Sequence, residues 1–221
     1  MPFFDNHQRA TLAAAMARII PTDETAGATE AGAIDFLDGY LSGVDRIYAL
    51  PDGSGFEALS GPRRAAWESR IEILRAKYVE GVRELDGLAR EHHGAGFADL
   101  GPDQQDDVLR AMERAEPQPR EAEASASTVP AYSFAPTKGA HEEGTEGPAL
   151  QQTNTEIELD FFPLLVVHTR QGFLADPIYG GNRDRVGWAA IGFPGPASLA
   201  EVHSGRYDTL PWFAETDDGQ A

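Results

Sequence analysis

The sequence predicts an all-α protein, a small bundle of five to six helices with a long irregular insertion and an irregular C-terminal tail. Apolar residues recur every three to four positions in several segments, which is the period of an amphipathic helix. Helix-start residues, prolines and glycines bound these segments, and no segment alternates apolar and polar residues as a half-buried strand does. Residues 1–221 fit a single helical domain, because a domain typically holds about 150 residues.

Two helices are expected before residue 43. Asp5 and Gln8 have the spacing of a capping box, which predicts a helix over residues 6–20 that Pro21 ends. A polar loop with two glycines follows this helix. A second, shorter helix comes next, with its apolar face at Ile34, Leu37 and Leu41.

The next two helices are separated by glycine-rich and proline-containing connections. Residues 43–61 carry few periodic apolar residues, so we expect an irregular connection there. Pro62 suits the first turn of the longest predicted helix, which covers about 28 residues and keeps one apolar stripe from Trp67 to Leu88. The sequence DQQDDVLRAMERA after Pro102 predicts a fourth helix, with acidic residues in the first turn where the helix dipole favours them.

Residues 116–155 form an acidic stretch rich in Pro, Ala and Glu, and residues 197–221 form the tail. A compact domain seldom holds so long a structureless segment. The stretch is therefore either a disordered insertion or an arm that wraps a partner, which would bury Tyr132 and Phe134. The tail offers only Trp212 and Phe213 as strong apolar anchors.

The fifth predicted helix, EIELDFFPLLVVHTRQGFLA, is apolar on most of its circumference, so we expect it to be contacted on two sides. Pro163 should kink this helix unless it lies in the first turn. The stretch DPIYGGNRDRVGW follows, and a sixth short helix is expected over residues 182–191.

Composition excludes several function classes. Lys and Arg total 18 against 36 for Asp and Glu, and the net charge of −18 disfavours nucleic-acid binding. The absence of cysteine excludes disulfides and thiolate-bound metal centres. The longest apolar run is too short to span a membrane. The N-terminal residues show no signal-peptide or twin-arginine pattern, so we expect a cytoplasmic protein.

The glycine pair Gly180 and Gly181 raises the question of a phosphate-binding loop. A phosphate-binding loop needs a following lysine, and a dinucleotide site needs a preceding strand, and both are absent from the sequence here. We therefore interpret both glycines as turn residues with positive φ and Asn182 as the cap of the sixth helix. Arg183 and Asp184 then pair within the turn or reach a partner.

His168 is the strongest single candidate for acid–base chemistry, because an imidazole titrates near neutral pH. A histidine on an apolar helix is more often a hydrogen-bonded core or interface residue. His92 and His93 are adjacent in sequence and cannot share a metal ion as an i, i+4 pair can. An enzyme that uses His168, Asp176 and Arg183 on a small ligand is one alternative function for the chain.

Three stretches carry a family resemblance. The first helix ends in RIIP before an acidic loop with glycines, and the second stretch is FADLGPDQQDDVLRAME. The third, GFLADPIYGGNRDRVGWAAIGFPG, matches at nearly every position a signature of the gluconate 2-dehydrogenase small-subunit family, also called subunit 3. The chain resembles that family over residues 3–115 and 156–196.

The resemblance implies a non-catalytic small subunit bound to a large flavin-dependent dehydrogenase of the glucose-methanol-choline oxidoreductase family, which oxidises sugars or polyols. In such complexes the large subunit holds FAD and the active site, so we expect no catalytic, cofactor or metal site in this chain. A dissociable folding or export chaperone for the same flavoenzyme is a second alternative.

An interface with such a partner should contain aromatic anchors and the polar residues of the signature. The expected partner-facing residues are Phe161, Phe162, His168, Phe173, Asp176, Tyr179, Asn182, Arg183, Asp184, Trp188 and Phe193, with Tyr132 and Phe134 in the insertion.

Overall fold

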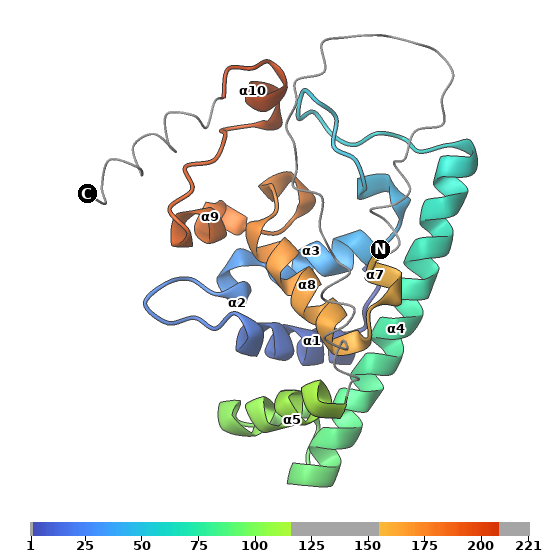
Figure 1. The fold of residues 1–221 in the computed structure, drawn as a ribbon, viewed down its shortest axis with the longest axis vertical. Helices are drawn as coiled ribbons and strands as arrows, with labels where there is room; N and C mark the ends of the chain where they lie inside the picture. Colours follow the sequence, from blue (N-terminus) through green and yellow to red (C-terminus); the bar gives the residue numbers. More distant parts are fainter. Residues whose placement is uncertain (1, 116–154, 208–221) are drawn as a thin grey trace, which may run out of the picture.

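The computed structural model describes residues 2–115 and 155–207, which form a helical bundle (Figure 1). The α-helices are α1 (Asn6–Ile19), α2 (Ala28–Ala31), α3 (Ala33–Leu41), α4 (Gly61–His93), α5 (Pro102–Ala115), α7 (Thr155–Glu158), α8 (Phe161–Leu174), α9 (Val186–Ala190) and α10 (Leu199–His203). Short 3-10 helices are η1 (Val44–Arg46), η2 (Phe97–Asp99), η3 (Pro177–Tyr179) and η4 (Arg183–Arg185). Within these residues the sole β feature is an antiparallel bridge between Ala49 and Phe56, so the all-α prediction is confirmed.

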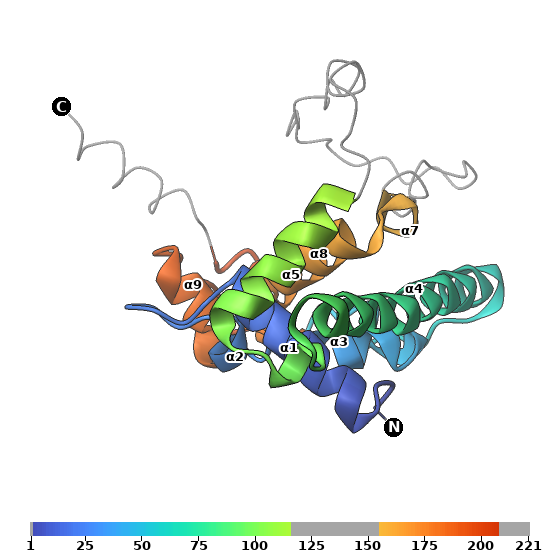
Figure 2. The same cartoon turned by 90° about the horizontal axis from the view of Figure 1, so that it is seen from below.

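Helix α8 lies at the centre of the bundle and packs against α3, α1, α4, α5, α2 and α9. Its buried residues are Phe161, Leu164, Leu165, His168, Thr169, Gly172 and Phe173. Helix α4 runs along one side of the bundle, and the view from below shows that it extends well past α5 and α8 (Figures 1 and 2). The many helices around α8 explain why its sequence is apolar on most of its circumference.

Local signals set the ends of the first helix and the long helix. The Asp5 carboxylate accepts a 2.8 Å hydrogen bond from the Gln8 amide, and the Asp5 amide donates to the Gln8 side chain at 3.1 Å, so the predicted capping box is present. Helix α1 ends at Ile19, one residue before the predicted end. Helix α4 is 33 residues long, and Gly94 ends it in the left-handed conformation at φ 79°.

The fifth predicted helix is two helices, which corrects the expectation of one continuous helix. Helix α7 ends at Glu158, and Asp160 takes an extended conformation at the N-terminal cap of α8. Pro163 is then the third residue of α8. The amide of a first-turn residue has no partner inside the helix, so a proline there removes no hydrogen bond and causes no kink.

The sixth predicted helix, residues 182–191, is also shorter than expected. Asn182, Asp184 and Arg185 have left-handed backbone conformations, with φ of 44°, 55° and 59°. Left-handed residues cannot continue a right-handed helix. The segment therefore forms η4 and then the five-residue helix α9.

The insertion predicted at 116–155, with Tyr132 and Phe134, lies outside the described residues except for its last residue, which begins α7. The tail predicted at 197–221 is described as far as residue 207 and includes α10, whereas Trp212 and Phe213 lie outside the described part. None of the described helices is both long and apolar enough to cross a membrane.

The contact between α4 and α8 yields a test of the core. A Cβ atom at Gly81 would overlap the ring of Phe161, whereas a Cβ at the exposed Gly87 would meet no atom within 4 Å. We expect Gly81→Ala to lower the free energy of unfolding by about 1 to 3 kcal/mol through overpacking. Gly87→Ala on the same helix should raise it by about 0.5 to 1 kcal/mol. Urea unfolding of both variants measures the difference, and equal effects would contradict this packing.

Candidate functional site

A buried polar pair lies beside the centre of the bundle. Tyr78 of α4 and His168 of α8 are both completely buried, and the Tyr78 hydroxyl lies 2.7 Å from His168 Nδ1. The two rings also stack, with centroids 5.7 Å apart. His168 Nε2 lies 3.7 Å from a carboxylate oxygen of Glu156, too far for a hydrogen bond, and makes no hydrogen bond to any described residue.

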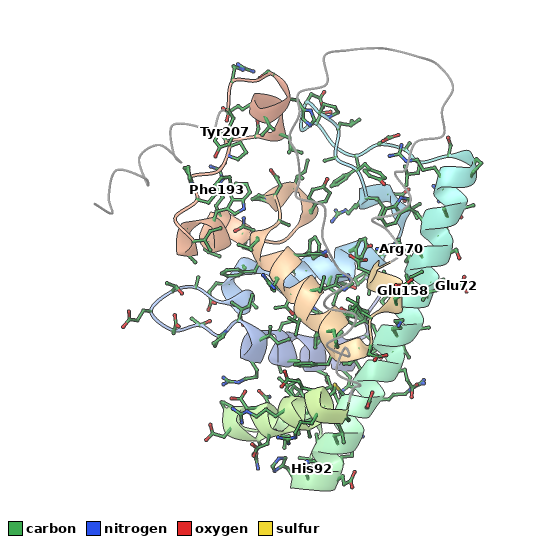
Figure 3. All side chains as sticks on the ribbon, viewed as in Figure 1. Arg70, Glu72, His92, Glu158, Phe193 and Tyr207 are labelled. Atoms are coloured by element: carbon green, nitrogen blue, oxygen red, sulfur yellow. The ribbon has the colours of Figure 1, made fainter. Side chains whose placement is uncertain are left out.

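The Glu156 carboxylate ties α7 to three other helices. Arg70 of α4 donates to it at 2.5 Å, and the Tyr40 hydroxyl of α3 donates at 3.2 Å. Gln171 of α8 donates to the other oxygen at 3.3 Å. Figure 3 shows Arg70 pointing from α4 toward α7, whereas Glu72 on the same helix points outward. The carboxylate is thus the common acceptor for α3, α4 and α8.

The pKa values follow from this environment. Burial by itself raises the pKa of the Glu156 carboxyl, but the nearby imidazole of His168 and guanidinium of Arg70 outweigh burial and lower that pKa to about 2. Burial raises the pKa of Tyr40, and the charge of Glu156 raises it further. Glu156 is therefore ionised at neutral pH, and Tyr40 keeps the proton that it donates.

An aromatic pocket of about 480 Å³ opens beside this network. Helix α3, the η1 segment, α4, α8 and η3 each contribute to its walls. We call it the aromatic pocket and define it by Phe36, Tyr40, Arg46, Ile47, Tyr48, Trp67, Gln171, Leu174, Ala175, Asp176 and Tyr179.

The polar tips of the pocket's rings are already bonded inside the chain. The Trp67 ring nitrogen donates to the Tyr48 hydroxyl at 3.2 Å, and the Tyr179 hydroxyl accepts from the Ala49 amide at 3.2 Å. The Tyr40 hydroxyl is bonded to Glu156. The rings therefore present mainly carbon surface to the pocket, which suits an occupant that is apolar where it meets them.

The stretch after α8 is held by a side-chain clamp. The buried amide of Asn182 donates to the Ala175 carbonyl at 3.0 Å and accepts from the Gly187 amide at 2.9 Å. A Cβ atom at Gly181 would overlap the Gly172 carbonyl, so this close approach of two chain segments needs glycine. Gly180 has a positive φ, 92°, and Gly181 does not, which corrects the prediction that both glycines supply positive φ. Asn182 precedes η4 and makes no side-chain capping bond to it, but its side-chain oxygen accepts the amide of Gly187, the second residue of α9, so the predicted capping role is met at α9.

A comparison with family models matches residues 6–195 to the model described as gluconate 2-dehydrogenase subunit 3. The chain belongs to the gluconate 2-dehydrogenase subunit 3 family. No curated protein and no solved structure matched the chain. The family resemblance found in the sequence is therefore confirmed over most of the chain.

The structure separates the residues expected to face a partner of this subunit 3 protein into two groups, and their role at a partner remains a prediction. The buried group packs inside the described chain and consists of Phe161, His168, Phe173, Asn182 and Trp188. The accessible group consists of Phe162, Asp176, Tyr179, Arg183, Asp184 and Phe193. Of these, Asp176 and Tyr179 line the aromatic pocket.

The three residues of the alternative enzyme hypothesis each have a separate contact. His168 is bonded to Tyr78, and Arg183 forms a 2.5 Å ion pair with Asp35. Asp176 accepts from the Ile178 amide at 3.0 Å and so caps η3. Within the described part of the chain, no group of three or more His, Asp or Glu side chains could hold a metal ion.

Sequence reasoning missed the residues that build the network and most of the pocket. Glu156 is 86 positions from Arg70 and 116 from Tyr40 in the sequence, so no local pattern predicts that these side chains meet. A weak signal existed for the pocket, since Phe36 and Tyr40 lie four residues apart, as a stripe beside the core face of α3.

The Glu156 contacts predict a pH dependence. The pKa of Glu156 is about 2 in the folded chain against an ordinary value of 4.5, so its ionised form stabilises the fold above pH 4.5 and that contribution disappears as the pH falls toward 2. We expect the stability gap between the wild type and Glu156→Gln to shrink by about 2 kcal/mol between about pH 6 and about pH 3. Denaturant unfolding at several pH values measures this gap. Glu158→Gln, at an exposed position of α7, is the control, and a constant gap for Glu156→Gln would refute the assignment.

The Asn182 clamp predicts a large effect of one substitution. Asn182→Ala leaves the Gly187 amide and the Ala175 carbonyl without their partners and places alanine in a left-handed conformation. We expect a loss of about 2 to 4 kcal/mol. Asp184→Ala tests the left-handed backbone alone, because the exposed Asp184 side chain bonds to no other described residue, and should cost about 1 kcal/mol. Similar losses in both variants, measured by urea unfolding, would mean that the clamp contributes little.

Proposed function

We propose that this chain is a non-catalytic small subunit that binds and stabilises a large FAD-dependent oxidoreductase subunit of the glucose-methanol-choline type, which acts on a sugar or polyol. The observation that carries the proposal is the family match over residues 6–195. FAD and the reacting sugar would be held by the large subunit, and this chain would supply a folded surface against which the large subunit packs.

The side-chain contacts support a scaffolding role. The buried Tyr78 and His168 bond to each other, and Glu156 is enclosed by donors from three helices. Groups committed in this way hold helices together and are not presented to a substrate. One accessible surface that could receive another molecule is the aromatic pocket, whose lining includes Tyr, Trp, Phe and Arg, residue types that are enriched at protein interfaces.

Affinity purification from the native host tests this function. We expect the tagged chain to bring down a large protein in near-equal amount, with the absorbance spectrum of a flavin and a flavin-binding fingerprint in its sequence. Deletion of the gene for this chain should lower the soluble yield of that flavoprotein. The proposal is wrong if the tagged wild-type chain brings down no flavoprotein under any expression condition that yields folded chain.

The composition of the mature enzyme distinguishes a permanent subunit from a dissociable chaperone. A permanent subunit co-elutes with sugar-oxidising activity in size-exclusion chromatography, whereas a dissociable chaperone is found with the newly made flavoprotein and is missing from the active fraction.

A further inference from the structure

The aromatic pocket leaves apolar surface uncovered in the described chain. Phe36, Tyr40, Tyr48, Trp67 and Tyr179 are only half-buried. Leu174, also in the pocket lining, is a large apolar side chain that remains 36% exposed. A cluster of exposed apolar side chains lowers its free energy when another molecule covers it, and a pocket that accepts a single anchor residue is typical of an interface hot spot.

The pocket is poorly suited to a sugar. A site that binds a sugar offers free donors and acceptors for the hydroxyl groups, because a buried hydroxyl without a partner costs free energy. Here the lining is mainly carbon: the Tyr40 hydroxyl and the Trp67 ring nitrogen donate inside the chain, and the Tyr48 and Tyr179 hydroxyls each already accept one hydrogen bond. The occupant must therefore be mainly apolar where it meets the rings.

Arg46 adds a charge requirement. It lines the pocket, it is exposed, and its guanidinium forms no hydrogen bond or ion pair with a described residue. The chain has 36 acidic residues for 18 basic ones, and several other arginines are paired, such as Arg18 with Asp106 at 2.7 Å and Arg183 with Asp35 at 2.5 Å. A free, exposed guanidinium in the lining of a mainly apolar pocket is well placed to bind a carboxylate that comes with the occupant.

We propose that the aromatic pocket is the anchor site for the large subunit, which inserts an apolar side chain, aromatic or aliphatic, and places a nearby carboxylate on Arg46. This inference rests on the proposed function and names the face that the partner uses. A second copy of this chain is a poor occupant, because two chains of net charge −18 repel each other.

The experiment uses the complex of tagged chain and flavoprotein purified from the host, with affinities measured by biolayer interferometry after the two subunits are separated. Arg46→Glu reverses the charge in the pocket lining, and Leu174→Asp replaces an apolar lining residue by a carboxylate. Each should weaken binding at least about thirtyfold, as loss of a hot-spot contact does. Arg46→Lys keeps the positive charge and should weaken binding less than Arg46→Glu.

The matched controls make the same types of substitution at positions outside the pocket lining. Arg170→Glu changes a second exposed arginine, on α8, that has no partner among the described residues and lies outside the pocket lining. Ile191→Asp changes an apolar residue that is 58% exposed elsewhere. Both should change affinity by less than about threefold. Thermal unfolding followed by circular dichroism checks that every variant is folded.

The outcomes are distinguishable. If the wild-type chain binds no flavoprotein, the proposed function fails and the anchor site fails with it. If the wild type binds and the pocket variants bind equally well, the function stands and the anchor site is wrong. Two further results would also show that the anchor site is wrong. If Arg46→Glu weakens flavoprotein binding in the full chain but not in a chain shortened after residue 207, the tail is the occupant. If Leu174→Asp only converts a dimer of this chain to a monomer, a second copy is the occupant.

Discussion

The Glu156 carboxylate is the contact on which the arrangement of α3, α4, α7 and α8 depends. It accepts hydrogen bonds from Tyr40, Arg70 and Gln171, which belong to three different helices. A carboxylate that is largely withdrawn from water is costly unless it is paired and hydrogen-bonded, so the donors and the acceptor stabilise one another in this arrangement. The pKa of Glu156 is low because these surroundings stabilise its ionised form.

The network also shapes the surface beside it. Tyr40 of α3 and Gln171 of α8 both bond to Glu156, and both also line the aromatic pocket. Because the network fixes these two helices, it fixes the two walls of the pocket that they carry. The Asn182 clamp fixes another wall, since it holds the chain at Ala175, next to Asp176. A rigid pocket loses little conformational entropy when a partner binds, which favours affinity.

The family signature acquires a physical explanation in this structure. Its glycines allow chain segments to approach closely, as at Gly181 over the Gly172 carbonyl. Its asparagine bonds to two backbone groups, and its tryptophan, Trp188, donates to the Leu174 carbonyl at 2.8 Å. The buried part of the signature is thus occupied with building the turn after α8. The first residues of the signature also contribute to the pocket that we assign to the partner, through Leu174, Asp176 and Tyr179.

The sequence by itself determined the helical class, the capping box of α1, the stop at Pro21 and the apolar character of α8, because helix period and caps depend on neighbours within a turn or two. The family signature was also readable without a structure. The break before α8 and the left-handed residues after Asn182 were missed. Only the tertiary structure decided that Glu156 meets Arg70 and that a pocket forms. Such contacts join residues far apart in the chain, and their free energy depends on burial that no local pattern encodes.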